Sequence, residues 1–169
     1  MGSPKALLPV AGGTLLEWLH ARLAGEFRQV LVSANNLPLP VGFQLIPDRR
    51  PGSGPLAGIE AGLVAARYDA VVAVACDMPR VTAGLLAELV GCSEGSDAAV
   101  PRVGGRPEPV CACYRRSALP FISRALDEGR LQAAALLPEL RVRWLDKVDP
   151  DLFWSINTPA DYQLFRSAL

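Results

Sequence analysis

Hydrophobic and polar positions follow two patterns along this chain. Short uncharged runs rich in valine and alanine, of which residues 70–76 are the clearest, are typical of strands that are buried on both faces of a sheet. Between these runs, leucines recur every three or four residues, as on the buried side of an amphipathic helix. Strands that alternate with helices predict an α/β fold, with helices on both faces of a mainly parallel sheet.

Capping residues sharpen the expected bounds of the helices. Thr14, Thr82, Ser117 and Thr158 each stand where an N-cap is expected. We expect strands or short extended segments at residues 6–10, 29–34, 43–46, 70–76, 97–101, 110–114, 142–145 and 153–156. We expect helices at residues 14–24, 55–66, 82–91, 117–126 and 131–137, and a terminal helix that follows Thr158.

Composition points to one domain without a strong electric field. The chain has 169 residues, of which 50% are hydrophobic and 20% charged, so we expect residues 1–169 to form a single domain. The formal net charge is zero, which argues against binding to nucleic acid or to an anionic membrane. Because the chain shows neither a run as long as a membrane span nor a signal-like start, we expect a cytoplasmic protein.

Cysteine and histidine usage argues against a zinc site and against a disulfide framework. The four cysteines, at positions 76, 92, 111 and 113, form no Cys-x-x-Cys pair, and His20 is the only histidine. Cys111 and Cys113 are two residues apart in a predicted strand. We expect both to be small buried groups on one face of that strand.

The candidate chemistry begins with Asp77, the first charged residue after the apolar run 70–76. In open α/β sheets, ligands bind beyond the carboxyl ends of the strands, so a carboxylate here is well placed to hold a metal ion and phosphates. The alternative is that Asp77 only caps a turn before Pro79.

Lys5 is the second candidate. The chain has 17 basic residues, but Lys5 and Lys147 are its only lysines. A compact ammonium suits a phosphate contact made by a point charge. A solvated lysine near a terminus is the alternative.

Further polar groups follow other predicted strands. Asn35, Asp48 and Asn157 stand at or just past strand ends, which a doubly wound sheet brings to one edge. Asn35 could read the edge of a base or only support a turn. The glycine-rich segment 54–58 starts a helix and leaves backbone N–H groups for an anion or a nucleotide. A lysine, two aspartates, amides and free backbone donors suit phosphoryl or nucleotidyl transfer.

The loop at residues 102–109 contains two glycines, Arg102, Arg106 and Glu108. It is either a flexible hairpin or a substrate-binding loop.

Five segments together carry a family resemblance. Lys5-Ala-Leu-Leu, Gly54-Pro-Leu-Ala-Gly58, Ala75-Cys-Asp-Met-Pro79, Arg106-Pro-Glu-Pro109 and Ile156-Asn-Thr-Pro159 occur in this order over nearly the whole chain. In order and spacing the chain resembles the MobA family of molybdenum cofactor guanylyltransferases. The resemblance implies a Rossmann-like three-layer α/β/α nucleotidyltransferase. Such an enzyme joins GMP from GTP to the phosphate of molybdenum-molybdopterin, and releases pyrophosphate with Mg²⁺ as cofactor.

The resemblance also implies roles for single residues. Asp77 would be the magnesium ligand, and Lys5 would neutralise the triphosphate, so these two are the expected catalytic residues. Asn35 and Asp48 would contact the guanosine. The nucleotide pocket would be lined by Gly54, Pro55, Leu56, Ala57 and Gly58. Asn157 and the loop from Gly104 to Glu108 would face the pterin.

Two departures from the family pattern change these expectations. The family opens with a strand and a glycine-rich loop, of which only Met1-Gly2 is present here, so we expect the sheet to lack its first strand. Ser155 stands where the family often has asparagine, which bears on pterin recognition. The alternative functions are a non-catalytic nucleotide or pterin carrier, or a molybdopterin cytidylyl or sugar-phosphate nucleotidyltransferase. Cofactor-delivery or molybdoenzyme chaperone proteins are the expected partners beside GTP and the pterin.

Overall fold

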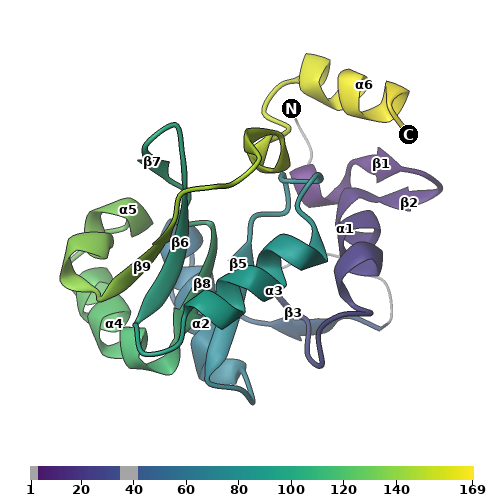
Figure 1. Cartoon of the computed structure of the whole chain (residues 1–169). Coiled ribbons are helices and arrows are strands. Elements are labelled where there is room, and N and C mark those ends of the chain that lie inside the picture. Colours follow the sequence, from purple (N-terminus) through teal and green to yellow (C-terminus); the bar gives the residue numbers. More distant parts are fainter. Residues whose placement is uncertain (1–3, 35–41) are drawn as a thin grey trace.

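A five-stranded sheet covered by helices on both faces forms the centre of the protein (Figure 1). The computed structural model describes residues 4–34 and 42–169. The sheet contains β5 (Ala70–Val74), β8 (Cys111–Arg115), β6 (Ala98–Val103), β7 (Arg106–Pro107) and β9 (Val142–Leu145). The predicted three-layer α/β/α fold is therefore confirmed.

The sheet is mixed rather than mainly parallel. β8 lies between β5 and β6 and is antiparallel to both, whereas β9 pairs with β6 in parallel. The reason lies in the turn that follows β6. Gly104 (φ 56°) and Gly105 (φ 80°) adopt the left-handed conformation that such a tight reversal requires, so the chain returns along the same sheet.

Two more strands form a separate parallel pair, β3 (Leu31–Ser33) and β4 (Gln44–Ile46). In the described part of the chain, no ladder joins this pair to the five-stranded sheet. Helix α2 (Gly54–Ala65) packs against β3, β4 and β5 and so connects the two sheets.

Alternate residues of the central strands face two separate cores. Ala98, Val100, Ala112 and Tyr114 pack with α2, α4 (Leu119–Asp127) and α5 (Ala133–Leu136). On the other face, α1 (Leu15–Leu23) and α3 (Ala83–Cys92) pack with a cluster that contains Cys111 and Cys113. Both cysteines are fully buried in this one cluster, as predicted. Short 3₁₀ helices lie at η1 (Lys5–Leu7), η2 (Arg116–Ala118), η3 (Leu137–Glu139) and η4 (Pro150–Phe153).

Three of the four predicted N-caps are confirmed. The hydroxyls of Thr14 and Thr158 each accept a hydrogen bond in a complete capping box, and Thr82 accepts one from the backbone N–H of Leu85. The prediction for Ser117 is wrong, because its hydroxyl donates to Asp97 at 2.7 Å and η2 precedes α4. Ser117 lies inside η2, and Ala118 is the N-cap residue of α4.

Two predicted extended segments also differ. Residues 6–10 contain η1 followed by β1 (Pro9–Val10), which forms a hairpin with β2 (Gly13–Thr14). Residues 153–156 form no strand: η4 ends at Phe153, and the backbone N–H of Ile156 bonds to the carbonyl of Asp77 instead of to a strand. A capping hydrogen bond from the backbone of Asp151 to Asp149 favours the 3₁₀ turn.

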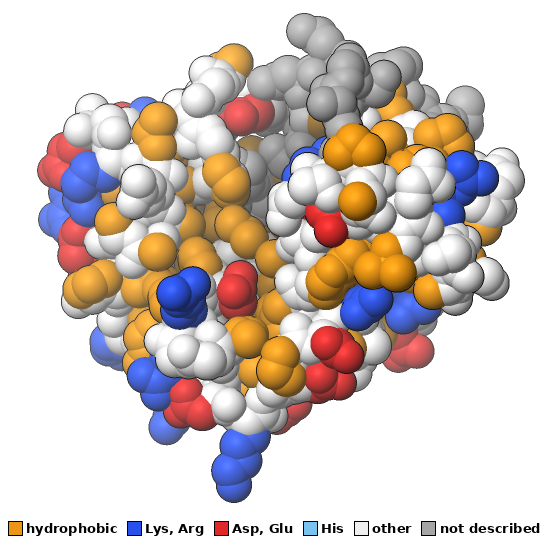
Figure 2. All heavy atoms as spheres, turned by 90° about the horizontal axis from the view of Figure 1, so that it is seen from above, with side chains coloured by type: hydrophobic (Ala, Val, Ile, Leu, Met, Phe, Trp, Pro, Cys, Tyr) orange, Lys and Arg blue, Asp and Glu red, His pale blue; other side chains and the backbone are white. Residues whose placement is uncertain are grey.

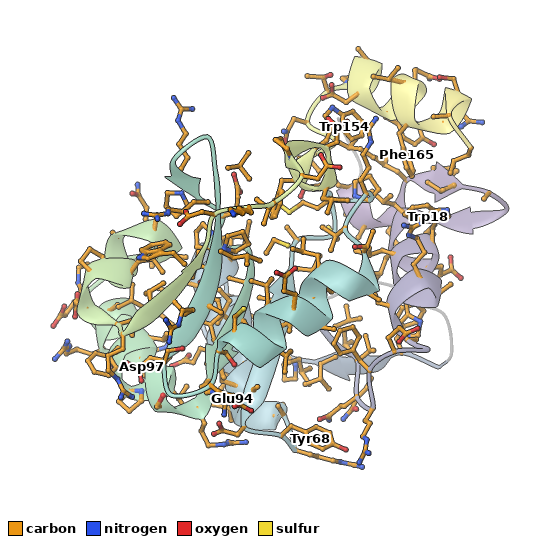
Figure 3. The ribbon with its side chains drawn as sticks, viewed as in Figure 1. Trp18, Tyr68, Glu94, Asp97, Trp154 and Phe165 are labelled. Atoms are coloured by element: carbon orange, nitrogen blue, oxygen red, sulfur yellow. The ribbon has the colours of Figure 1, made fainter. Side chains whose placement is uncertain are left out.

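A third, smaller core joins the two ends of the chain. Val10, Leu15, Ile156 and Phe165 pack together, which fixes α6 (Pro159–Ser167) beside the hairpin and α1. Trp18 meets Phe165 edge to face, with ring centroids 5.1 Å apart (Figure 3). This core places the two ends of the chain next to the turn that follows β5. Among the described residues, none of the helices has the length and apolar character that a bilayer span requires.

Candidate active site

The structure brings together three of the predicted site residues. The Nζ of Lys5 donates to Asp77 Oδ2 at 2.8 Å and to Asn157 Oδ1 at 2.9 Å, although these partners are 72 and 152 residues away in the sequence. The lysine and aspartate side chains are 32% and 23% exposed, so both can be reached from solvent. We call Lys5, Asp77 and Asn157 the lysine corner.

Backbone hydrogen bonds hold each member of the lysine corner in place. Asp77 lies in the turn after β5, and its carbonyl accepts the backbone N–H of Ile156 at 2.9 Å. The N–H of Asn157 donates to Asp161 Oδ2 at 3.0 Å. The Tyr162 hydroxyl donates to the carbonyl of Pro9, which ties α6 to the segment after Lys5. The corner is therefore a fixed feature of the fold.

The surroundings of the lysine corner favour the ionised form of Asp161. Hydrogen bonds from Thr158, followed by those from the backbone of Asn157 and the charge of Lys5, lower the pKa of Asp161. Among the described residues, Lys5 is the partner of Asp77 Oδ2, and Oδ1 of this carboxylate has no hydrogen-bond partner. One carboxylate oxygen beside an ammonium is a suitable arrangement for a cation and a phosphate.

A second group of predicted residues lies where β3 and β4 end. The Oδ1 of Asp48 accepts the backbone N–H of Arg50 at 2.8 Å. Ser33 and Ile46 are direct partners in the β3–β4 pair, so Asp48 follows the same edge by two residues. A Cβ at Gly58 would lie 3.5 Å from Ser33 Oγ. We call Ser33, Asp48 and the segment Gly54–Gly58 the aspartate corner. Asn35, predicted here too, lies outside the described residues.

The start of α2 has the features expected of an anion-binding or nucleotide-binding helix end. Gly54 has a φ of 69°, which favours glycine, and Pro55 stands in the first turn. Ser53 is the N-cap but its side chain makes no capping bond. Among the described residues, the first N–H groups of α2 thus have no side-chain cap.

The predicted substrate loop forms a hairpin in which β6 and β7 pair antiparallel. Arg102 forms two hydrogen bonds to Asp146, at 2.6 and 2.8 Å, and its guanidinium lies 4.8 Å from the centre of the Trp144 ring. Glu108 is held by backbone bonds at the start of β8, and burial raises the pKa of its carboxyl group. None of the described contacts joins Glu108 to the lysine corner. Whether the loop is a flexible hairpin or binds a substrate stays a prediction.

Seen from above, the molecule is hollowed between the part that carries α4 and α5 and the part that carries α1 and α6 (Figure 2). Hydrophobic side chains line much of this hollow, and acidic and basic groups are interspersed on this face.

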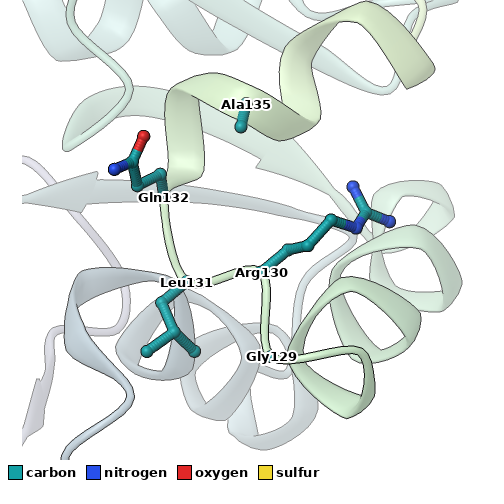
Figure 4. A pocket seen from close by; sticks show the side chains of 5 residues that line it. All are labelled: Gly129, Arg130, Leu131, Gln132 and Ala135. Atoms are coloured by element: carbon teal, nitrogen blue, oxygen red, sulfur yellow. The ribbon is translucent and has the colours of Figure 1, made fainter.

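The described part of the chain also contains two cavities. One, of about 450 Å³, is lined by Arg49, Arg50, Glu60 and Ser123. The other, of about 380 Å³, lies between α4 and α5 and is lined by residues 129–132 and Ala135 (Figure 4). In the second, Arg130 is already paired with Glu128 and Glu139, so it offers no ready charge to a ligand.

Sequence reasoning missed the ionic network around Glu60 in the first cavity. A glutamate in the otherwise apolar helix at residues 54–65 is the signal that was available. A carboxylate on the buried side of a helix needs donors from other elements, and no local pattern indicates which ones.

Comparisons with known proteins identify the family of this chain. The family model described as the MobA-like NTP transferase domain matches residues 1–143. A probable molybdenum cofactor guanylyltransferase from Pelotomaculum thermopropionicum is 32% identical over 95% of this chain and 83% of its own. The solved molybdopterin-guanine dinucleotide biosynthesis protein A from Archaeoglobus fulgidus is 28% identical. It superposes with a TM-score of 0.85 over 99% of this chain and 91% of its own.

A more distant solved structure shares the fold alone. The 2-C-methyl-D-erythritol 4-phosphate cytidylyltransferase from Thermus thermophilus is 24% identical, with a TM-score of 0.74 over 98% of this chain and 93% of its own. The family model covers residues 1–143, and the guanylyltransferase relative from Pelotomaculum thermopropionicum aligns over 95% of the chain. The match to the family model and this relative show that the chain belongs to the MobA-like NTP transferase family.

Proposed function

We propose that this protein transfers GMP from GTP to the phosphate of molybdenum-molybdopterin and releases pyrophosphate. The observation that carries the proposal is the contact of Lys5 Nζ with both Asp77 Oδ2 and Asn157 Oδ1. Three segments that lie far apart in the sequence therefore converge on one ammonium. Relatives named molybdenum cofactor guanylyltransferase support the choice of substrate.

The lysine corner would receive the triphosphate. An ammonium bound to two oxygen acceptors has one more proton to donate, and a phosphate oxygen is a suitable acceptor. As pyrophosphate departs, Lys5 would stabilise the charge that develops on it. Asn157 and the backbone that Asp161 holds would keep the ammonium aimed at this position.

Asp77 is the residue suited to hold Mg²⁺. In the described part of the chain, no group of three or more His, Cys, Asp or Glu side chains is arranged to hold a metal ion. Magnesium commonly binds one or two carboxylates, with substrate phosphates and water as its other ligands, so the single carboxylate of Asp77 fits this cation. When bound, Mg²⁺ would supply neutralisation of phosphate charge.

The chemistry needs no covalent intermediate on the protein. A phosphate oxygen of the pterin would attack the α-phosphorus of GTP, the new P–O bond would form, and the bond to the β-phosphate oxygen would break. Because the attacking phosphate is already an anion, no general base is needed. The protein would contribute positioning and charge.

The aspartate corner would hold the guanosine and the hairpin at residues 102–109 the pterin. Asp48 and the uncapped start of α2 offer a carboxylate and backbone donors to the nucleoside. Glu108 would contact the pterin from the hairpin, and burial raises the pKa of its carboxyl group. Cytoplasmic location and delivery proteins stay predictions of the family resemblance.

The deciding experiment measures nucleotide transfer directly. Incubated with molybdenum-molybdopterin and Mg²⁺, the protein should release pyrophosphate and form the guanine dinucleotide with GTP but much less product with CTP. Chelation of the metal should stop the reaction. Equal turnover of GTP and CTP, or transfer to a sugar phosphate, would contradict the proposed specificity.

A non-catalytic carrier is the second candidate. The carrier predicts binding of GTP or the pterin without any dinucleotide. Turnover by the chain excludes it.

A further inference from the structure

Arg50 lies beside the aspartate corner, and its backbone and its side chain bind different partners. Its backbone N–H donates to Asp48 Oδ1 at 2.8 Å. Its guanidinium reaches away from Asp48: Nε bonds to Glu60 Oε2 at 3.1 Å, and Nη1 lies 2.6 Å from Asp127 Oδ1. One residue thus connects the candidate nucleotide carboxylate to helices α2 and α4.

Glu60 is the fixed point of this network. Its side chain is only 5% exposed, and its second oxygen, Oε1, accepts the hydroxyl of Ser123 at 2.6 Å. A buried carboxylate with a donor on each oxygen has little freedom to move, and it holds Arg50 in one place. Asp127 is 65% exposed and serves as the outer partner.

We call Arg50, Glu60 and Asp127 the clamp. The clamp is connected to the two elements that flank the proposed nucleotide position. Glu60 belongs to α2, two residues beyond Gly58, and Asp48 follows β4 by two residues. The segment from Arg50 to Gly54 lies between them, and the backbone N–H of Ser53 bonds to the carbonyl of Arg50. The clamp therefore fixes the orientation of the Asp48 carboxylate. It also fixes the path of the backbone that leads to the start of α2.

We propose that Arg50, held by Glu60 and Asp127, is a positioning residue that orients Asp48 for recognition of the nucleoside. The inference rests on the proposed function, since Asp48 is assigned to the guanosine there. Arg50 acts through Asp48 and makes no contact with the nucleotide itself. Its guanidinium is occupied by two carboxylates, while its backbone N–H fixes one oxygen of Asp48.

The first experiment replaces Arg50 and measures the kinetic constants for each substrate separately. Arg50→Gln should raise the KM for GTP by about tenfold or more, because a small displacement of a binding group is costly. The kcat and the KM for the pterin should stay within about twofold of wild type. An unchanged KM for GTP overturns the proposal.

Arg130→Gln is the matched control. Arg130 also bridges two carboxylates, Glu128 and Glu139, but far along the chain from Asp48. It should leave the KM for GTP unchanged. An equal rise in both variants would show a general effect of lost ion pairs and would overturn the positioning role.

A double-mutant cycle separates positioning from direct contact. If Arg50 acts through Asp48, Arg50→Gln should add little to the KM already raised by Asp48→Asn. Additive effects would mean that Arg50 contacts the nucleotide directly, which also overturns the proposal. Asp127→Asn keeps the pair between Arg50 and the buried Glu60, so it controls for misfolding. This variant should raise the KM for GTP by less than Arg50→Gln does. An unchanged KM for GTP would contradict the clamp.

Amide hydrogen exchange gives a readout that does not need activity. Arg50→Gln should speed exchange at residues 50–54 and leave residues 128–139 as in wild type. If the wild-type protein transfers no nucleotide, the proposed function fails, yet this measurement still decides whether the clamp holds the loop. If wild type turns over GTP and exchange at residues 50–54 does not change, the clamp alone fails.

Discussion

Two aspartates, Asp77 and Asp97, lie at opposite strand ends of the five-stranded sheet. Their surroundings differ: those of Asp77 suit a ligand site, and those of Asp97 suit a structural role. Asp77 follows β5 at its carboxyl end, and Asp97 directly precedes β6. β5 and β6 run in the same direction, since both are antiparallel to β8. The two aspartates therefore lie at opposite ends of the strands.

The number of donors distinguishes them. Asp97 is 5% exposed and accepts four hydrogen bonds: one from Ser117 Oγ, and three from Arg141 through its backbone N–H, Nε and Nη2. These bonds, led by that of the Arg141 side chain, hold the pKa of Asp97 well below its usual range. In the described structure, Asp77 has only Lys5 as side-chain partner and is more exposed. A saturated carboxylate supports the fold, whereas an unsaturated one can bind a ligand.

The largest effect should come from breaking the lysine corner at its acid. Asp77→Asn should lower turnover by about a hundredfold or more, because the group suited to hold the cation loses its charge. The melting temperature should change little. Pyrophosphate release and thermal unfolding measure the two. Asp69→Asn, at the other end of β5 and also ion-paired, is the matched control and should keep wild-type turnover.

Removal of the ammonium should have the next largest effect. Lys5→Gln should reduce kcat/KM for GTP by about tenfold to a hundredfold, since a neutral amide stabilises pyrophosphate charge less well. Lys147→Gln removes the other lysine of the chain and should have no effect. Similar losses in both variants would mean that Lys5 contributes only to net charge.

Asp97→Asn should give the opposite outcome to Asp77→Asn. It should lower the free energy of unfolding by about 2 kcal/mol, while turnover per folded molecule stays unchanged. Denaturant unfolding and turnover measured on the same sample test this. A loss of turnover without a loss of stability would contradict the structural role of Asp97.

The contribution of Asp97 should also depend on pH with a defined sign. Its folded pKa is lower than its unfolded pKa of about 4, so the stabilisation is complete above that value and is lost as the pH falls through the folded pKa. Wild type should therefore lose more stability than Asp97→Asn between about pH 5 and pH 2. Parallel acid unfolding curves for the two proteins would contradict this.

The smallest effects should come from two glycines of α2. A Cβ at Gly58 would meet Ser33 Oγ at 3.5 Å, and one at Gly62 would meet Val71 Cγ1 at 3.6 Å, both ordinary contacts. Alanine at either position should raise stability by about 0.5–1 kcal/mol. Only Gly58→Ala should weaken GTP binding, because only Gly58 lies in the aspartate corner. Calorimetry that finds equal affinities for both variants would remove Gly58 from the pocket.

Much of the fold follows from the sequence because its causes are local. The capping boxes at Thr14 and Thr158 and the apolar run at residues 70–76 depend on neighbours within a few positions. Both caps formed as predicted, and the run formed β5, which ends two residues earlier than expected. The predicted strand at residues 153–156 failed since its backbone bonds to the turn at Asp77, far away in the sequence. The direction of β8 depended on a tight turn and a choice of neighbour that hydrophobic patterning does not express.

The sequence by itself determined which residue types could do the chemistry, because a strand end with an aspartate, a rare lysine and an amide is visible without coordinates. Only the tertiary structure decided which of them meet. Lys5, Asp77 and Asn157 come together through a small core shared by both ends of the chain. Asp97 and Glu60 are acids of the same kind, yet burial and distant donors give them supporting roles. Long-range packing sets how many donors surround each carboxylate, and no local pattern contains that information.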